Sequence, residues 1–436
     1  MKISFYGGAG EVGRSCIMIS TEKTKILLDA GVKLGEKEEY PLIGDRMLNE
    51  IDAVLVTHAH LDHCGYLPHI YTAGYKGMVY ATKPTVELIN VLISDYMHIS
   101  NPSNVTKNGI ERLHKSYKIV EYNKKIRLND LEVEFIPAGH IVGSAMIRVS
   151  DGRKSVLYTG DVHLARTRLL DGADVKGLSS DVLITESTYA SKQDVFTSEA
   201  KIAKDMLKSI NETIDMGGKV IIPSFAVGRA QEVLLFLDDY INSGVMRKVP
   251  VYVDGMINKA MRIYRHNVIY CRDELQKKIL MSDYDPFKSS NFVPVEKKEM
   301  RGKIATEDQS SIIVTTSGML TGGPVLYYIS RLAKNSANKM ILVGYQAEGT
   351  LGRRLLEGNK TVHVNGKEIS VQMAVENYHL SAHADRRQLD TLVSSISNLK
   401  SVFIVHGDPS KSEEFRNDIS GKYKAYTPKI GDTFEV

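Results

Sequence analysis

The 436-residue chain has 43% hydrophobic and 25% charged residues and a formal net charge of +4, which excludes a disordered chain and a generic polycation. A nucleic-acid partner would therefore need a local basic channel. The length predicts two or three structural units. The three cysteines, Cys16, Cys64 and Cys271, lie far apart, which argues against a disulfide framework and for a reducing compartment. No apolar run suits a signal peptide or membrane span, so we expect a cytoplasmic protein without a membrane partner.

The first predicted elements are strands. Residues 1–6 are strand-like and lead into Gly-Ala-Gly-Glu-Val-Gly at 8–13, which matches a dinucleotide-binding pattern. However, residues 15–20 and 25–29 are also strand-like, so no helix N-terminus follows that could hold a pyrophosphate. We interpret the glycines as a loop bending over a metal site. Asp29 ends its strand, where it could orient a ligand histidine or simply begin a turn.

The next strand carries the strongest chemical signal. Residues 51–56 are apolar and β-branched, and Thr-His-Ala-His-Leu-Asp-His-Cys follows at 57–64. His58 and His60 can point to the same side of an extended chain, whereas Asp62 and His63 fall on the following turn and can reach a second position. The spacing therefore favours two metal ions. Imidazole and carboxylate ligands suit zinc, with manganese or iron as weaker candidates.

Cys64, at the end of this motif, is either a thiolate ligand or, as we prefer, a small buried residue beside the site. Residues 84–97 have the apolar spacing of a helix, and 100–121 form a polar connection. Further strands, beginning at residues 131, 155 and 182, then run into His140, Asp161 and Glu186. Such endings can converge beside the first cluster, with His58, His60 and His140 on one metal, Asp62 and His63 on the other, and Asp161 bridging.

These motifs resemble those of a known superfamily. The His58-Ala-His60-Leu-Asp62-His63 segment, His140 and Asp161 are similar to the metal motifs of metallo-β-lactamases. Glu186 in Thr-Glu-Ser-Thr-Tyr, His383 in Ser-Ala-His-Ala-Asp and His406 in Val-His-Gly-Asp resemble the added motifs of its β-CASP nucleases. The chain looks like the archaeal homologues of the cleavage and polyadenylation specificity factor endonuclease subunit. We expect the form without KH domains, because the catalytic fold begins at residue 1.

The resemblance implies an α/β protein with an αββα metallo-β-lactamase fold and an inserted α/β β-CASP domain. We expect the first part of the metallo-β-lactamase domain at 1–190, the β-CASP domain at 191–360 and the return segment at 361–436. In the insert, three strands run into glycine-containing loops, whose backbone N–H groups can bind phosphate or simply form turns. The insert would close over the metals and form an RNA cleft. Its candidate RNA contacts are Ser224, Arg229, Ser317, Gly318, Arg353 and Arg354, the arginines being equally compatible with solvated positions.

By resemblance, His406 completes the second metal, Asp62 belongs to the catalytic centre, and His383 is a catalytic acid held by Glu186. An imidazole suits this role because its pKa lies near the operating pH. His379 departs from the endonuclease pattern and resembles ribonuclease J. It could help to recognise RNA 5′ ends together with Ser381, or could cap a strand end or pack on Tyr378.

The function implied is a ribonuclease with two Zn²⁺ ions per chain, or Mn²⁺ in their place, that leaves 5′-phosphate and 3′-hydroxyl ends. We expect an endonuclease of RNA 3′-end processing or decay, with a 5′→3′ exoribonuclease of ribonuclease J type as the alternative. DNA-processing relatives typically carry valine where this chain has His406. Small-molecule ester or thioester hydrolysis and a binding-only subunit are more remote. The expected partners are RNA, a second copy of the chain, and an RNA-processing or transcription complex.

Overall fold

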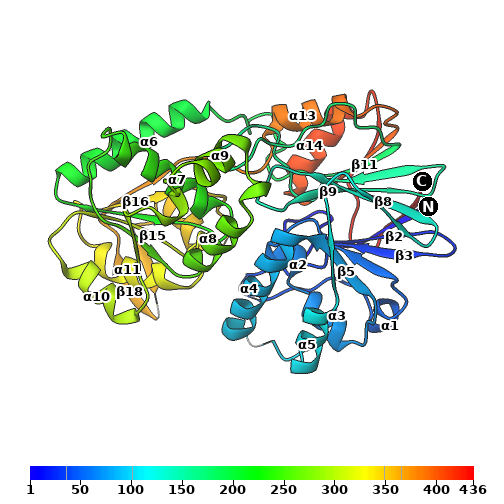
Figure 1. Cartoon of the computed structure of the whole chain (residues 1–436), viewed down its shortest axis with the longest axis horizontal. Helices are drawn as coiled ribbons and strands as arrows, with labels where there is room; N and C mark the ends of the chain where they lie inside the picture. The colour runs from blue at the N-terminus through cyan, green and yellow to red at the C-terminus, as the bar shows by residue number, and fades with distance from the viewer. Residues whose placement is uncertain (36, 101, 348, 365) are drawn as a thin grey trace. The chain divides into compact units, whose positions relative to one another are not determined.

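The computed structural model describes every residue except 36, 101, 348 and 365 (Figure 1). The chain divides into two compact units. The first comprises Met1–Val195 and Ala382–Val436, and the second, Phe196–Ser381, is inserted into it. None of the described helices combines the length and the apolar composition that a membrane crossing requires.

The first unit contains two seven-stranded sheets. In spatial order, the first sheet consists of β22 (Thr433–Glu435), β1 (Lys2–Gly7), β2 (Cys16–Ser20), β3 (Lys25–Leu28), β4 (Ala53–Leu55), β5 (Met78–Thr82) and β6 (Tyr117–Val120). The second consists of β21 (Lys424–Tyr426), β20 (Ser401–Val405), β11 (Val182–Glu186), β10 (Ser155–Tyr158), β9 (Ala145–Ser150), β8 (Leu131–Pro137) and β7 (Lys125–Leu128). Strands β3 to β6 are mutually parallel, and so are β10, β11, β20 and β21.

One hydrophobic core lies between the two sheets. Alternate residues of β1, including Phe5, face inward and meet alternate residues of β20, including Phe403, with the two ring centroids 5.6 Å apart. The other residues of β20, including Ile404, pack under α13 (Arg386–Ser395) and α14 (Pro409–Ile419). Helices α1 (Asp45–Leu48), α2 (Leu61–Cys64), α3 (Leu67–Thr72), α4 (Lys83–Ser100) and α5 (Lys107–Lys115) lie beside the first sheet (Figure 1). The expected αββα arrangement is therefore present.

Helix α5 and strand β6 lie where we expected only a polar connection. Thr106 caps α5 by accepting the N–H of Gly109 at 3.1 Å. Leu113 and Gly109 are the helix residues that are buried, so the apolar pattern of α5 is too sparse to stand out in the sequence. The prediction failed because capping and tertiary packing stabilise this helix, rather than its own periodicity.

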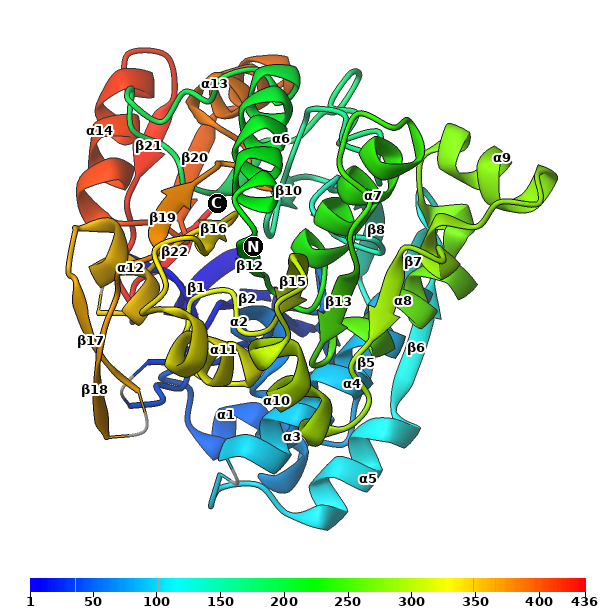
Figure 2. The same ribbon diagram turned by 90° about the vertical axis from the view of Figure 1, so that its left-hand side faces the viewer.

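The second unit has a six-stranded, fully parallel sheet. Its order is β14 (Phe292–Pro294), β13 (Val251–Asp254), β15 (Ser311–Thr315), β12 (Lys219–Pro223), β16 (Lys339–Leu342) and β19 (Ala374–Asn377). Its α-helices are α6 (Glu199–Asp215), α7 (Arg229–Asn242), α8 (Ile257–His266), α9 (Asp273–Met281), α10 (Lys298–Thr306), α11 (Pro324–Leu332) and α12 (Leu351–Leu356). A hairpin of β17 (Thr361–Val364) and β18 (Lys367–Ser370) lies at its edge (Figure 2).

The return to the first unit comes later than we expected. Residues 361–381, assigned above to the return segment, belong to the second unit because β19 pairs with β16 in its sheet. An ion pair of 2.8 Å between Lys339 of β16 and Glu376 of β19 joins the two strands. The described boundary lies between Ser381 and Ala382. It thus falls two residues before His383.

Candidate metal centre

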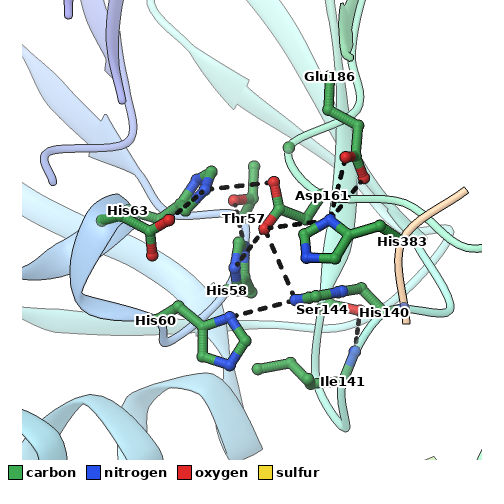
Figure 3. A network of polar contacts seen from close by, with 12 residues as sticks. Thr57, His58, His60, His63, His140, Ile141, Ser144, Asp161, Glu186 and His383 are labelled. Carbon is green, nitrogen blue, oxygen red and sulfur yellow. Dashed lines mark hydrogen bonds and ion pairs between the residues drawn. The ribbon is translucent and has the colours of Figure 1, made fainter. Parts of the chain in front are cut away.

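Strand ends in the first unit bring the predicted metal ligands together. Figure 3 labels His58, His60, His63, His140 and Asp161 among them. The residues follow β4, β8, β10 and β20 or lie in the short helix α2. Their ligand atoms form two groups, each within 4.8 Å, which are His58, His60, His140 and Asp161, and Asp62, His63 and His406. A third set within the same distance, Asp161, Glu186 and His406, overlaps with both groups. The positions on the strand and on the following turn are those that the spacing predicted.

Asp161 faces both groups with different oxygens. Its Oδ2 lies 3.4 Å from His58 Nε2 and 3.6 Å from His140 Nε2. Its Oδ1 lies 3.3 Å from His63 Nε2 and 3.2 Å from His406 Nδ1. A single buried carboxylate therefore lies between the two sets of imidazoles.

The hydrogen bonds of the histidines direct their lone pairs inward. His140 Nδ1 donates to the carbonyl oxygen of Ala382 at 2.8 Å, and His63 Nδ1 donates to Asp29 at 2.7 Å. A carbonyl or carboxylate oxygen can only accept, so Nδ1 carries the hydrogen in both rings. In a neutral ring, Nε2 then has an unprotonated lone pair that points into the cluster. This is the tautomer that a metal ligand requires.

Asp29 is the residue on which this arrangement depends most. Besides His63, its carboxylate accepts the backbone N–H of Thr57 at 2.7 Å, the Thr57 hydroxyl at 2.8 Å and the Tyr158 hydroxyl at 2.9 Å. Because the Thr57 hydroxyl donates to Asp29, it accepts from Nδ1 of His58 at 3.0 Å. Asp29 thus orients one histidine of each group, directly or through Thr57. The sequence did not identify Thr57 or Tyr158, whose roles depend on this long-range contact.

The cluster passes a direct test of fit to a metal. His58 Nε2, His63 Nε2, Asp161 Oδ1 and His406 Nδ1 are buried, and among the described residues they have no hydrogen-bond partner. Leaving such atoms unsatisfied costs about 1–3 kcal/mol each. Ligand atoms about 2.0–2.2 Å from a tetrahedral zinc ion lie roughly 3.3 Å from one another, and the Asp161 separations of 3.2–3.6 Å agree with this value. The residues present therefore fit a metal ion.

The electrostatics of the site keep Asp161 ionised and His140 neutral. Burial alone would raise the pKa of Asp161, but the facing His63 and His406 outweigh it and hold this pKa well below its usual range. Burial and the nearby His383 lower the pKa of His140, so this ring is neutral and can act as a ligand.

Beside the cluster lies the predicted acid. Nδ1 of His383 is 3.0 and 3.2 Å from the two carboxylate oxygens of Glu186, which is fully buried (Figure 3). The N–H of Val162 donates to Glu186 at 2.7 Å and fixes the carboxylate. Burial lowers the pKa of His383, but Glu186 and Asp161 outweigh it, and the net pKa is raised. With Nδ1–H directed at Glu186, Nε2 is the ring atom that can gain or lose a proton.

The glycine loop that precedes β2 contacts the site through its backbone. The carbonyl of Gly8 accepts the N–H of His406 at 2.7 Å, and Ser15 N–H donates to the carbonyl of Asp62 at 2.8 Å. Gly31 comes so close that an added Cβ would lie 1.7 Å from the Asp62 carbonyl oxygen. Strand β2, not a helix, follows this loop. Cys64 is buried, and its thiol donates to the carbonyl of Ala59 at 3.1 Å, as a small packed residue would.

The predicted RNA contacts in the loops of the second unit are packed or hydrogen-bonded within those loops. Ser224 is buried after β12, and an added Cβ at Gly318 would lie 2.9 Å from the N atom of Phe225. The Ser317 hydroxyl accepts the N–H groups of Thr321 and Gly322 at 3.1 and 3.3 Å. These contacts order the loops themselves, and RNA binding by these residues stays a prediction.

The arginines and His379 also have protein contacts. Arg229 begins α7 and is only 9% exposed, whereas a clamp on RNA needs an accessible guanidinium. Arg353 forms an ion pair of 2.7 Å with Glu357. His379 is exposed and stacks on Phe196, with ring centroids 5.3 Å apart and planes at 13°. The structure thus places the ring of His379 against Phe196.

The sequence matches three family models. A Metallo-beta-lactamase superfamily domain matches residues 18–189, a Beta-Casp domain matches 230–355, and a Zn-dependent metallo-hydrolase RNA specificity domain matches 368–428.

Similar curated proteins are archaeal. A transcription termination factor FttA of Methanocaldococcus jannaschii is 36% identical over 455 residues, which cover 100% of this chain and 72% of that protein. The FttA of Methanothermobacter thermautotrophicus is 37% identical, with coverage of 98% and 70%. An RNase J-like protein of M. jannaschii is 36% identical, with coverage of 95% and 94%. A crystal structure of a protein of unknown function from Enterococcus faecalis V583 is similar, with a TM-score of 0.59 over 99% of both chains. At 13% identity, this likeness supports the fold alone.

Proposed function

We propose, since the chain belongs to the metallo-β-lactamase superfamily and carries its β-CASP domain, that it is a zinc-dependent ribonuclease with two metal sites. Family membership confirms the resemblance noted in the motifs and makes the chain a metal-dependent nuclease. The proposal of two metal sites rests on Asp161, because its two carboxylate oxygens face two separate groups of ligands.

The residues of the site divide the chemistry between them. When bound, the metal ions supply Lewis-acid stabilisation of the phosphate and lower the pKa of water. His58, His60 and His140 would hold one ion, Asp62, His63 and His406 the other, and Asp161 both. Zinc suits this donor set, and manganese is the alternative.

His383 provides the proton for the leaving group. Glu186 fixes its Nδ1–H, so a protonated His383 can donate from Nε2 to the departing 3′ oxygen of RNA. This bond cleavage leaves 5′-phosphate and 3′-hydroxyl ends. The hydrogen bond between His383 and Glu186 supports a role for this pair in protonating the leaving oxygen, beside the ligands whose metals would activate water.

RNA is the substrate class that the comparisons favour. Residues 368–428 match an RNA specificity domain, and a relative of nearly the same length is named RNase J-like. The name transcription termination factor, carried by other relatives, supports a transcription or RNA-processing complex as a partner. We propose internal cleavage of transcripts as the main activity.

A second mode, 5′→3′ exonuclease cleavage, is supported by one residue. His379 is exposed and lies two residues before Ser381, so the pair could donate hydrogen bonds to a terminal phosphate. Small-molecule hydrolysis would use the metals but would assign no role to the second unit. A binding-only subunit would not need a complete set of ligands.

An assay on labelled RNA distinguishes these functions. Metal-loaded protein is incubated with RNA labelled at its 5′ or 3′ end, and the products are separated by length. Internal fragments with 5′-phosphate ends are expected. Release of mononucleotides from the 5′ end would instead support the exonuclease, and intact RNA would contradict both nuclease functions.

A further inference from the structure

Three consecutive residues around His383 are bound by loops that carry metal ligands. The Ala382 carbonyl accepts Nδ1–H of His140 at 2.8 Å, and the His383 carbonyl accepts from Nδ1 of His163 at 3.1 Å. The N–H of Ala384 donates to the carbonyl of Val162 at 2.7 Å. The backbone that carries the proposed acid is therefore attached to the loops that contain His140 and Asp161.

His163 is the member of this set without a role in metal binding or proton transfer. It lies two residues after Asp161 and is only 6% exposed. Its N–H donates to the carbonyl of Ala138 at 2.9 Å, and its carbonyl accepts the N–H of Ala173 at 2.8 Å. Gly139 packs so closely that an added Cβ would lie 2.3 Å from the His163 carbonyl oxygen. The backbone of His163 is thus fixed on both sides, and its ring starts from a defined position.

The hydrogen bond from His163 to His383 has one possible direction. The His383 carbonyl oxygen can only accept, so Nδ1 of His163 carries the hydrogen. Nδ1–H is present in the imidazolium and in this neutral tautomer, so the contact requires no change of charge. His163 therefore provides a fixed donor to the backbone of the proposed acid.

His383 is consequently held at two separate points. Glu186 holds the ring through Nδ1, and His163 holds the main chain through the carbonyl. If the His163 contact were lost, only the bonds of Ala382 and Ala384 would hold the main chain on either side of His383. The ring could then rotate about its hydrogen bond to Glu186, and Nε2 would move relative to the leaving oxygen. Displacement of a reacting group by about 1 Å can slow a reaction roughly 10²-fold.

We propose that His163 is a positioning residue that sets the location of the His383 imidazole through the His383 carbonyl. This inference rests on the proposed function, in which His383 protonates the leaving oxygen. It assigns His163 an effect on proton donation and none on metal binding. The hydrogen bonds made by Val162 and His163 also fix the position of His383 relative to Asp161.

The test compares two substrates whose leaving groups differ in their need for protonation. RNA has a poor alkoxide leaving group, whereas bis(p-nitrophenyl) phosphate releases a stable phenolate that needs no general acid. His163→Phe keeps an aromatic ring and removes the donor, and His163→Gln keeps an N–H donor. We expect His163→Phe to lower kcat on RNA roughly 10- to 100-fold, with KM, zinc content and the rate on bis(p-nitrophenyl) phosphate unchanged. His163→Gln should recover most of the loss.

His69 offers a matched control in the same unit. Its Nδ1 also donates to a backbone carbonyl, that of Asn104 at 2.9 Å, in a part of the first unit that carries no metal ligand. His69→Phe should leave both activities unchanged. Thermal unfolding and zinc content check that each variant is folded, and His163→Leu carries the same prediction if the phenylalanine variant is unstable.

The outcomes separate this inference from the proposed function. An equal loss on both substrates, a loss of zinc, or an unchanged rate on RNA in the folded His163 variants would overturn the positioning role. If His383→Ala selectively slows RNA cleavage while His163→Phe does not, the proposed function stands and this inference fails. A wild type that cleaves neither substrate overturns both.

Discussion

Nδ1 of His383 lies 3.0 Å from a carboxylate oxygen of the buried Glu186. The pair adjoins the metal ligands, since Nδ1 of His383 lies 3.9 Å from Asp161 Oδ2, so substitutions of the pair need metal content and cleavage rate measured together. His383→Ala should keep the bound metal yet cleave RNA roughly 10²–10⁴-fold more slowly, the usual effect of losing a positioned general acid. Glu186→Gln should act in the same direction. Metal analysis and single-turnover rates check both, and a loss of metal from His383→Ala would make His383 a ligand instead.

The two ligand groups predict different effects of removing single histidines. Wild type should bind close to two metal equivalents. His140→Ala should weaken one site and His406→Ala the other, so that each variant retains about one equivalent, whereas Asp161→Ala should weaken both. Activity should fall by several orders of magnitude in all three. Elemental analysis after loading and desalting measures the content. Similar losses in His406→Ala and Asp161→Ala, with both sites emptied, would argue against separate groups.

The hydrogen bonds to Asp29 predict graded effects on metal affinity. Asp29→Asn removes the charge that orients His63 and Thr57, and should weaken metal binding roughly 10- to 100-fold. Thr57→Val removes the hydroxyl that joins Asp29 to His58 but keeps the bond between Asp29 and His63, so it should weaken the first group selectively. Tyr158→Phe removes one donor to Asp29 and leaves the others in place, so it should have the smallest effect of the three. Competition with a coloured chelator gives the affinities, and equal affinity in wild type and Asp29→Asn would contradict this role.

The exposed ring of His379 predicts a dependence on the RNA 5′ end. A terminal monophosphate carries more negative charge than an internal phosphodiester and attracts additional donors. If His379 binds it, the protein should degrade 5′-monophosphorylated RNA faster than 5′-hydroxyl or 5′-triphosphorylated RNA. His379→Ala should remove this preference and leave internal cleavage intact. Equal rates on all three ends in the wild type would leave the stack on Phe196 as the role of His379.

The strand-end residues explain why much of the site could be predicted. Asp161, Glu186 and His406 follow or end β10, β11 and β20, whose parallel carboxyl ends meet at one edge of the second sheet, and His58 follows β4 of the first sheet. The positions of these candidate ligands could therefore be recognised from the local sequence. The local sequence did not reveal the roles of Tyr158 and Thr57, because their contacts with Asp29 join segments that are far apart in the chain.

The boundaries of the units were harder to predict for the same reason. Residues 374–377 precede the Ser-Ala-His motif and look like part of the returning fold, but they form β19 and pair with β16. Strand pairing of this kind depends on long-range packing, which a single sequence does not reveal. The buried Arg229 is a similar case, because an arginine in a loop-to-helix segment gives no signal of its burial.

We propose that two metal ions, held around Asp161, allow this chain to hydrolyse RNA. The cleavage rate of end-labelled RNA, measured as metal-free protein is titrated with zinc, tests this directly. We expect no cleavage without metal and a rate that rises until two equivalents per chain have been added. Full activity at one equivalent, or cleavage in the absence of metal, would contradict it.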